Sequence, residues 1–207
     1  QRVVVPTNAL AALPDKVTFS QAATFPVAGL TALHALGKGG LLLGKRVLVT
    51  GATGGVGDFA VQLARLAGAH VTASVRRADQ VPTVRQLGAH DVVVGDAIAA
   101  TPKHDLIIES VGGQTLGTAL AALERGGTGV TLGVSASSEV AFDARNFFVA
   151  GRTTLYGFYL FTELGNEPAS VGLRRLAELV AAGQLSPHIS LERPWKEIGQ
   201  VAQDLMA

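Results

Sequence analysis

A glycine-rich turn between two apolar segments constrains this chain more than any other feature. Residues 47–49 form an apolar run typical of a buried strand, and apolar side chains recur at helical spacing over residues 56–66. The segment 51–57 between them is rich in glycine. A glycine inside a strand or helix costs about 0.5–1 kcal/mol relative to alanine, so these glycines indicate a turn. The pattern therefore predicts a strand, a turn and a helix in succession, with free backbone N–H groups and the positive end of a helix dipole directed at one spot.

The glycine spacing matches a dinucleotide-binding fingerprint, with Ala52 in place of the usual first glycine. Gly54 would let a pyrophosphate approach the backbone, and Gly57 would let the helix pack closely on the strand. A purely structural turn is the alternative that the spacing alone leaves open. Because a strand and a helix flank the turn, we predict dinucleotide binding.

Segments typical of strands alternate with segments typical of helices along most of the chain. The predicted strands are residues 47–49, 70–75, 91–94, 105–109, 129–132 and 155–158, with a further short strand at 189–191. The predicted helices are residues 29–36, 56–67, 81–87, 115–123, 171–182 and 195–206, after a short helix that Ser20 would cap. We predict an α/β fold of the Rossmann type, a doubly wound parallel sheet of about six strands with helices on both faces.

The composition argues against several classes of function. The 207 residues carry a net charge of +1 and only 16% of them are charged, which gives no electrostatic case for nucleic acid. No apolar run approaches the length of a membrane span and no signal peptide opens the sequence, so we predict no membrane partner and a cytoplasmic location. The lack of cysteine excludes disulfides and thiolate metal sites. The five histidines show no metal-ligand spacing, so no metal is predicted.

The end of the second predicted strand bears on the choice of nucleotide. An acidic residue at this point would hold the ribose 2′-hydroxyl of NAD. The residues from the strand end at Val75 to Ala78 include no aspartate or glutamate, and the first acidic residue is Asp79. A 2′-phosphate would instead find Ser74 as a donor and the guanidinium groups of Arg76 and Arg77. Two solvated arginines on a loop are the alternative. Together with the glycine-rich turn, these residues favour NADPH.

Catalytic side chains are not evident from the sequence. Glu109 ends an apolar strand, and we interpret it as a carboxylate hydrogen-bonded to loop backbone rather than as a general base. The spacing from Thr50 to Gly57 also fits the short-chain dehydrogenase loop, which requires a tyrosine with a lysine four residues later. Neither Tyr156 nor Tyr159 has one, so we reject that alternative and leave the catalytic residues unknown.

Three motifs in order make the chain resemble the zinc-free medium-chain dehydrogenase/reductases, in particular the quinone oxidoreductase and enoyl reductase branch. They are Ala22-Ala23-x-x-x-Val27-x-Gly29-Leu30-Thr31-Ala32, then Gly51-Ala52-x-Gly54-Gly55-Val56-Gly57, then Asp105-x-x-x-Glu109-Ser110-Val111-Gly112-Gly113. The resemblance covers nearly the whole chain. It implies a hydride carried on NADPH and a quinone or enone substrate.

The resemblance also implies a row of contacts along the cofactor. Gly54, Gly55 and Val56 would hold the pyrophosphate, and Ser74, Arg76 and Arg77 the 2′-phosphate. Ser110 and Val111 would line the adenosine ribose, and Gly133, Val134 and Ser135 the nicotinamide ribose. Thr31, Phe158 and Tyr159 would lie at the nicotinamide. The family often has a lysine shortly after the second strand, but here Asp79 and Gln80 occupy that place, so the arginines must do its work.

Family members begin with a GroES-like domain, and the resemblance starts here at what looks like its last strand, at residues 1–5. We therefore expect residues 1–20 to be a remnant linking to that absent domain, 21–184 to be the NADP-binding domain, and 185–207 to pack back toward the absent domain. The expected function is an NADPH-dependent oxidoreductase of the quinone or enone type, with this chain as its cofactor-binding domain. The alternative is a module that holds NADPH without catalysis. The family suggests a homodimer through an edge strand near 155–158.

Overall fold

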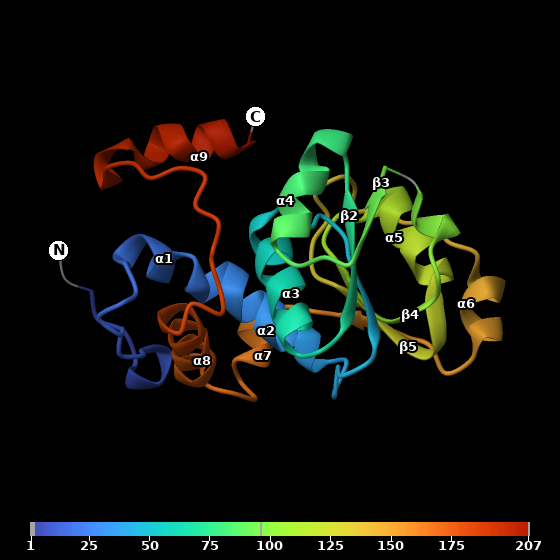
Figure 1. Cartoon of the computed structure of the whole chain (residues 1–207), viewed down its shortest axis with the longest axis horizontal. Coiled ribbons are helices and arrows are strands. Elements are labelled where there is room, and N and C mark those ends of the chain that lie inside the picture. The colour runs from blue at the N-terminus through green and yellow to red at the C-terminus, as the bar shows by residue number, and fades with distance from the viewer. Residues whose placement is uncertain (1–2, 96, 207) are drawn as a thin grey trace.

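A computed structural model describes residues 3–95 and 97–206 and contains one six-stranded parallel sheet (Figure 1). The spatial order is β3-β2-β1-β4-β5-β6, which is the doubly wound order of dinucleotide-binding folds. The strands are β1 (Arg46–Val49), β2 (His70–Val75), β3 (Asp91–Val94), β4 (His104–Glu109), β5 (Leu123–Thr131) and β6 (Thr154–Gly157). The chain order reverses between β1 and β4, which places the crevice of such folds beyond the carboxyl ends of these two strands.

Helices cover both faces of the sheet, as Figure 1 shows for α3 and α4 on one side and α5 and α6 on the other. The helices are α1 (Phe19–Ala23), α2 (Leu30–Gly37), α3 (Gly55–Leu66), α4 (Val81–Gln86), α5 (Gly113–Ala121), α6 (Ala144–Ala150), α7 (Leu160–Glu163), α8 (Ala169–Ala181) and α9 (Ile198–Met206). Short 3-10 turns lie at Thr7–Ala9, Ala78–Gln80, Ala97–Ala100 and Trp195–Glu197. The predicted fold class is confirmed.

Alternating side chains of the central strands separate two apolar cores. Val47 and Val49 of β1 pack with α2, α3 and α8, whereas Leu48 packs with α5 on the opposite face. In β4, Ile108 joins the first core and Ile107 the second. This alternation follows from the two-residue period of a strand, and burial on both faces explains why the strands read as continuous apolar runs.

Several predicted boundaries differ from the structure. Residues 3–5 and 189–191 are not strands, and residues 1 and 2 lie outside the described part of the chain. The first helix is capped by Thr18 rather than Ser20, because the Thr18 side chain accepts from the Gln21 N–H and the Gln21 side chain accepts from the Thr18 N–H. This reciprocal pair is a capping box.

The predicted helix at 115–123 and the strand at 129–132 both need correction. The helix α5 ends at Ala121, and β5 begins at Leu123, so Gly126 lies within the strand rather than at a helix end. The pairing of β4 with β5 shifts register between His104 and Leu106, and this irregularity accommodates the glycines. A second departure is a π-helical turn at Phe25–Gly29, through which the chain continues into α2 without a break.

Hydrogen bonds from Gln62 of α3 hold the segment that follows α8 against this helix. The Gln62 side chain accepts from the Ser186 N–H at 2.9 Å and donates to the Ser186 carbonyl at 3.0 Å. Asp58, one turn earlier, accepts from the Gln62 amide and from the His188 N–H. These bonds hold the returning segment against the helix that starts at the glycine-rich turn. Beyond it, α9 stands off the sheet on the side of α1 (Figure 1).

We predict that His104 makes the protein acid-sensitive. Its ring is fully buried, with Nε2 3.3 Å from the Thr72 hydroxyl, and burial lowers its pKa from 6.5 to about 4. As pH falls from 6.5 to 4, His104 becomes protonated in the unfolded state but stays neutral in the folded state. The free energy of unfolding therefore falls by about 3 kcal/mol over this window. Urea unfolding across this range should give a clearly flatter pH dependence for His104→Leu. An identical slope in the variant would contradict the assignment.

Candidate dinucleotide-binding site

The glycine-rich turn connects β1 to α3 through backbone contacts that leave no room for a side chain at Gly57. Gly51 has a φ of +56°, which L side chains rarely adopt. A Cβ on Gly57 would lie 2.3 Å from the Gly51 carbonyl oxygen and 2.7 Å from the Ala52 Cα. The predicted role of Gly57 in close packing of helix on strand is therefore confirmed.

Backbone N–H groups in the first turn of α3 have no hydrogen-bond partner among the described residues. Gly54 is the N-cap and contributes no side-chain cap, and the first N–H bonded back to it is that of Asp58. The N–H groups of Gly55, Val56 and Gly57 precede the first intrahelical bond, so no carbonyl of the helix accepts from them. Gly54 and Gly55 are exposed, so an anion can reach them. These residues fit a pyrophosphate, which would accept from the amides and meet the positive helix end.

The end of β2 lies against this turn. The Ala52 N–H donates to the Ser74 carbonyl at 3.2 Å, and Ser74 is buried while Arg76 and Arg77 are exposed. Arg77 is already engaged, because its Nε and Nη2 each lie 3.0 Å from a carboxylate oxygen of Asp79. The hydrogen bond from Arg77 lowers the pKa of Asp79. Among the described residues Arg76 has no ion-pair partner, so it is the more available guanidinium.

Glu109 organises the loop after β4. The carboxylate is fully buried and accepts from the N–H groups of Val111 at 2.8 Å and Gly112 at 3.0 Å, and from the Thr50 hydroxyl at 3.2 Å. Burial raises the pKa of Glu109, and these hydrogen bonds oppose that effect. The interpretation of Glu109 as a loop-holding carboxylate is confirmed. Its contact with Thr50, which ties the ends of β1 and β4 together, was not foreseen.

The ends of β5 and β6 complete the same edge of the sheet. The Ser135 hydroxyl and N–H donate to the Ser110 carbonyl at 3.2 and 3.4 Å, which joins the loops after β4 and β5. Gly133 faces Ser110 so closely that a Cβ would lie 2.7 Å from its carbonyl oxygen. After β6, Phe158 is buried and Tyr159 is 64% exposed.

The predicted site residues therefore gather at one edge. All but Thr31 lie at or just after the carboxyl ends of the neighbouring parallel strands β2, β1, β4, β5 and β6. They are Ser74, Arg76, Arg77, Gly54, Gly55, Val56, Ser110, Val111, Gly133, Val134, Ser135, Phe158 and Tyr159. Thr31 is buried at the start of α2, just after the π-helical turn whose Ala28 lies beside Gly55. Their individual contacts to a cofactor stay predictions. Gln80, whose side chain donates to Thr53 in the glycine-rich turn, has no predicted role beyond standing where the family often has a lysine.

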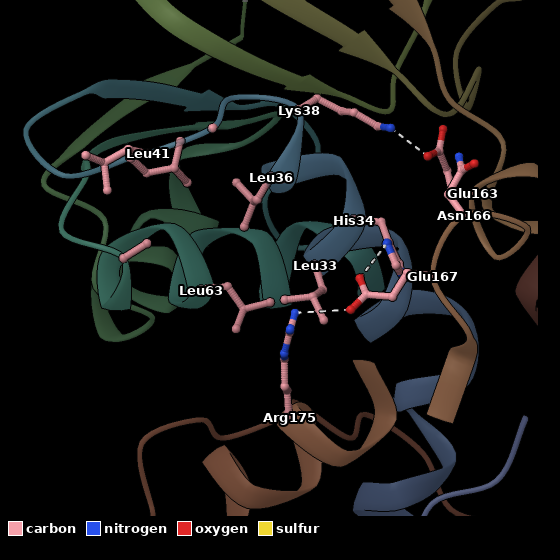
Figure 2. Close-up of a pocket in the computed structure, with 14 residues that line it drawn as sticks. Leu33, His34, Leu36, Lys38, Leu41, Leu63, Glu163, Asn166, Glu167 and Arg175 are labelled. Carbon is pink, nitrogen blue, oxygen red and sulfur yellow. Dashed lines mark hydrogen bonds and ion pairs between the residues drawn. The ribbon is translucent and has the colours of Figure 1, made fainter. Parts of the chain in front are cut away.

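A separate cavity of about 660 Å³ lies at the opposite end of α3, beside the last turn of α2 (Figure 2). Figure 2 shows Lys38 directed at Glu163, at 2.6 Å, and His34 and Arg175 both directed at Glu167. The hydrogen bond from Lys38 is the main cause that lowers the pKa of Glu163. Since Lys38 and Arg175 already face carboxylates, the described lining of the cavity offers a ligand no lysine or arginine without an ion-pair partner.

The sequence profile of the zinc-binding dehydrogenase family matches residues 55–177, more than half of the chain. The chain belongs to this family, within the medium-chain dehydrogenase/reductases. Within the described residues, no group of three or more histidine, cysteine, aspartate or glutamate side chains is placed to hold a metal. No described helix has the length and apolar character needed to cross a membrane.

Other medium-chain dehydrogenase/reductases are similar over almost the whole chain. The mouse protein "NAD(P)H oxidoreductase RTN4IP1, mitochondrial" is 34% identical, and the match covers 95% of this chain and 55% of the mouse protein. The solved structure of AibC has a TM-score of 0.86 at 27% identity, covering 98% of this chain and 61% of AibC. The solved structure of the quinone oxidoreductase from Coxiella burnetii has a TM-score of 0.76 at 27% identity, and the match covers 93% of this chain and 59% of the Coxiella chain. The chain thus spans little more than half the length of these relatives and corresponds to their cofactor-binding domain.

We predict that Gly57→Ala destabilises the fold by about 1–3 kcal/mol, because the added methyl group must displace the backbone of the turn. Nucleotide affinity should fall with it. Gly37→Ala at the end of α2 is the matched control, since its Cβ would meet nothing within 4 Å and alanine favours a helix by up to about 1 kcal/mol. Urea unfolding measures both. Equal stability of Gly57→Ala and the wild type would contradict the packing argument.

Proposed function

We propose that the parent protein is an NADPH-dependent reductase of quinones or enones and that this chain binds its cofactor. The observation that carries the proposal is the junction of an open helix terminus at Gly55 with the exposed Arg76 at the end of the neighbouring strand. The names of the mouse and Coxiella relatives, an NAD(P)H oxidoreductase and a quinone oxidoreductase, support the reaction class. The chain spans only part of each, so the activity of the whole protein rests on this proposal.

The choice of NADPH over NADH rests on the charges after β2. An NAD site requires a free acid at the strand end to accept from the ribose hydroxyls. Asp79 is held by Arg77 and cannot serve freely, whereas Arg76 is available to a 2′-phosphate. Ser74 would add a hydroxyl donor from the end of the strand.

The roles proposed for the chain are binding and orientation. When bound, the cofactor supplies the hydride that reduces the substrate. The amides at the start of α3 hold the pyrophosphate, and Glu109 fixes the loop beside it by accepting from Val111 and Gly112. Phe158 and Tyr159 bound the nicotinamide end. We assign no proton donor.

A further domain of the parent protein would complete the substrate pocket. Large apolar side chains are exposed on the segments outside the sheet, including Phe19 at 87% and Trp195 at 69%. They line a cavity of about 470 Å³ between α1 and the segment before α9. We propose that residues 1–20 link to such a domain, that 21–184 form the NADP-binding domain, and that 185–207 pack toward the missing part.

Location and assembly follow as parts of the same proposal. We retain the cytoplasm as the predicted compartment, although the mouse relative is named as mitochondrial. We propose a homodimer through β6, which pairs with β5 on one side and has no strand neighbour on the other among the described residues.

The main alternative is a module that holds NADPH without turning over a substrate. Titration of the chain with NADPH and NADH by nucleotide fluorescence, followed by quinone and enone reduction assays, separates the two. Turnover supports the reductase. Tight NADPH binding without turnover supports the binding module for this chain.

We predict that the double variant Arg76→Ala, Arg77→Ala binds NADPH about 10- to 100-fold more weakly, because charge-assisted bonds to the 2′-phosphate contribute about 1.5–3 kcal/mol. NADH affinity should change by less than about threefold, since NADH lacks that group. Arg174→Ala, an exposed arginine on α8, is the matched control and should alter neither affinity. Equal losses for NADPH and NADH in the double variant would refute the 2′-phosphate assignment.

A further inference from the structure

Gln80 links two loops of the candidate site by hydrogen bonds at both ends of its side chain. The half-buried residue ends the 3-10 turn after β2. Its Oε1 accepts from the backbone N–H groups of Arg76 and Arg77, each at 3.1 Å. Its Nε2 donates to the Thr53 hydroxyl at 3.2 Å, in the middle of the glycine-rich turn. One amide thus uses its acceptor on one loop and its donor on the other.

These bonds act on the backbone that carries the two arginines. After β2 ends at Val75, the N–H groups of Arg76 and Arg77 have no strand partner and would otherwise bond to water. Accepting from both fixes the direction in which the chain leaves the strand. It therefore fixes the points from which both guanidinium groups extend.

The bond to Thr53 ties this backbone to the turn that precedes α3. Between the same two loops, the Ala52 N–H also donates to the Ser74 carbonyl at 3.2 Å. The bond between Ala52 and Ser74 joins backbone to backbone where the two loops begin. The Gln80 link lies farther along the second loop and is the one that reaches the arginines.

We propose that Gln80 is a positioning residue that sets the preference for NADPH over NADH, an inference that rests on the proposed NADPH site. By holding the arginine-bearing loop at a fixed place relative to the glycine-rich turn, Gln80 makes the pyrophosphate site and the 2′-phosphate site one preorganised unit. A nucleotide that carries both phosphates then binds without ordering the second loop. A nucleotide without the 2′-phosphate gains little from that order.

The test compares full-chain variants by fluorescence titration with NADPH and NADH. Gln80→Met keeps the length of the side chain and removes its amide. Thr53→Val removes only the hydroxyl that accepts from Gln80, and Thr53→Ser restores it. Gln86→Met on the exposed face of α4 is the matched control, because the same change there touches no described hydrogen bond.

We expect Gln80→Met to weaken NADPH binding about 5- to 15-fold and NADH binding less than about twofold, so that the preference falls. Thr53→Val should lower the preference in the same direction by a smaller factor, and Thr53→Ser should restore it. Adding Thr53→Val to Gln80→Met should cause no further change, because the bond is already lost. Gln86→Met should leave both affinities unaltered.

The outcomes separate this inference from the proposal beneath it. If the wild type binds neither nucleotide, or prefers NADH, the proposed NADPH site is wrong and the role of Gln80 falls with it. If the wild type prefers NADPH and Gln80→Met weakens both nucleotides by the same factor, Gln80 only stabilises the fold and the positioning role is overturned. If Thr53→Val loses the same preference a second time in the Gln80→Met background, the two residues do not act through their mutual bond, which also overturns it.

Discussion

The contact between Gly57 and the backbone of Gly51 and Ala52 is the constraint on which the rest of the site depends. Without a side chain at Gly57, α3 can begin directly above the end of β1. This approach places the unpaired N–H groups of the first helical turn at the carboxyl edge of the sheet, where the chain order reverses between β1 and β4. A larger residue at position 57 would push the helix start away from that edge and separate its amides from the neighbouring strand ends.

Hydrogen bonds between neighbouring loops make this edge a single surface. Glu109 joins the end of β1 to the loop after β4 through Thr50, and Ser135 joins the loops after β4 and β5 through the Ser110 carbonyl. Gln80 joins the end of β2 to the glycine-rich turn. Each link uses a polar side chain or backbone group that would be left unpaired if its loop moved. Loops with such reciprocal bonds are preorganised, which lowers the entropic cost of binding a long nucleotide across them.

Prediction from the sequence succeeded where the apolar residues fit only one type of secondary structure. It failed where the same residues are compatible with more than one. The bounds of β2 and β3 agree with the prediction, because each is a short β-prone run bounded by turn residues. The glycines at 126–127 lie between the predicted helix 115–123 and the predicted strand 129–132, yet they belong to β5, where the register shift with β4 accommodates them. The segment 189–191 has the alternating pattern of a strand yet pairs with no described strand. The residues just before it follow α3 instead, because Ser186 bonds to Gln62 and the His188 N–H donates to Asp58. Strand formation needs a neighbour, which local pattern does not supply.

The sequence by itself determined the strand, turn and helix around Gly57, the alternation of strands and helices, and the set of residues that follow the strand ends. These follow from local periodicity and from the conformational cost of glycine. Only the tertiary structure decided which strands are neighbours, and therefore that the loops after β2 and β1 meet. It also decided that Arg77 is occupied by Asp79 while Arg76 remains available, and that Gln80 reaches Thr53. These contacts depend on the position and direction of side chains that the fold brings together. Because a hydrogen bond weakens steeply with distance and angle, the spacing of residues along the chain does not predict which bonds form.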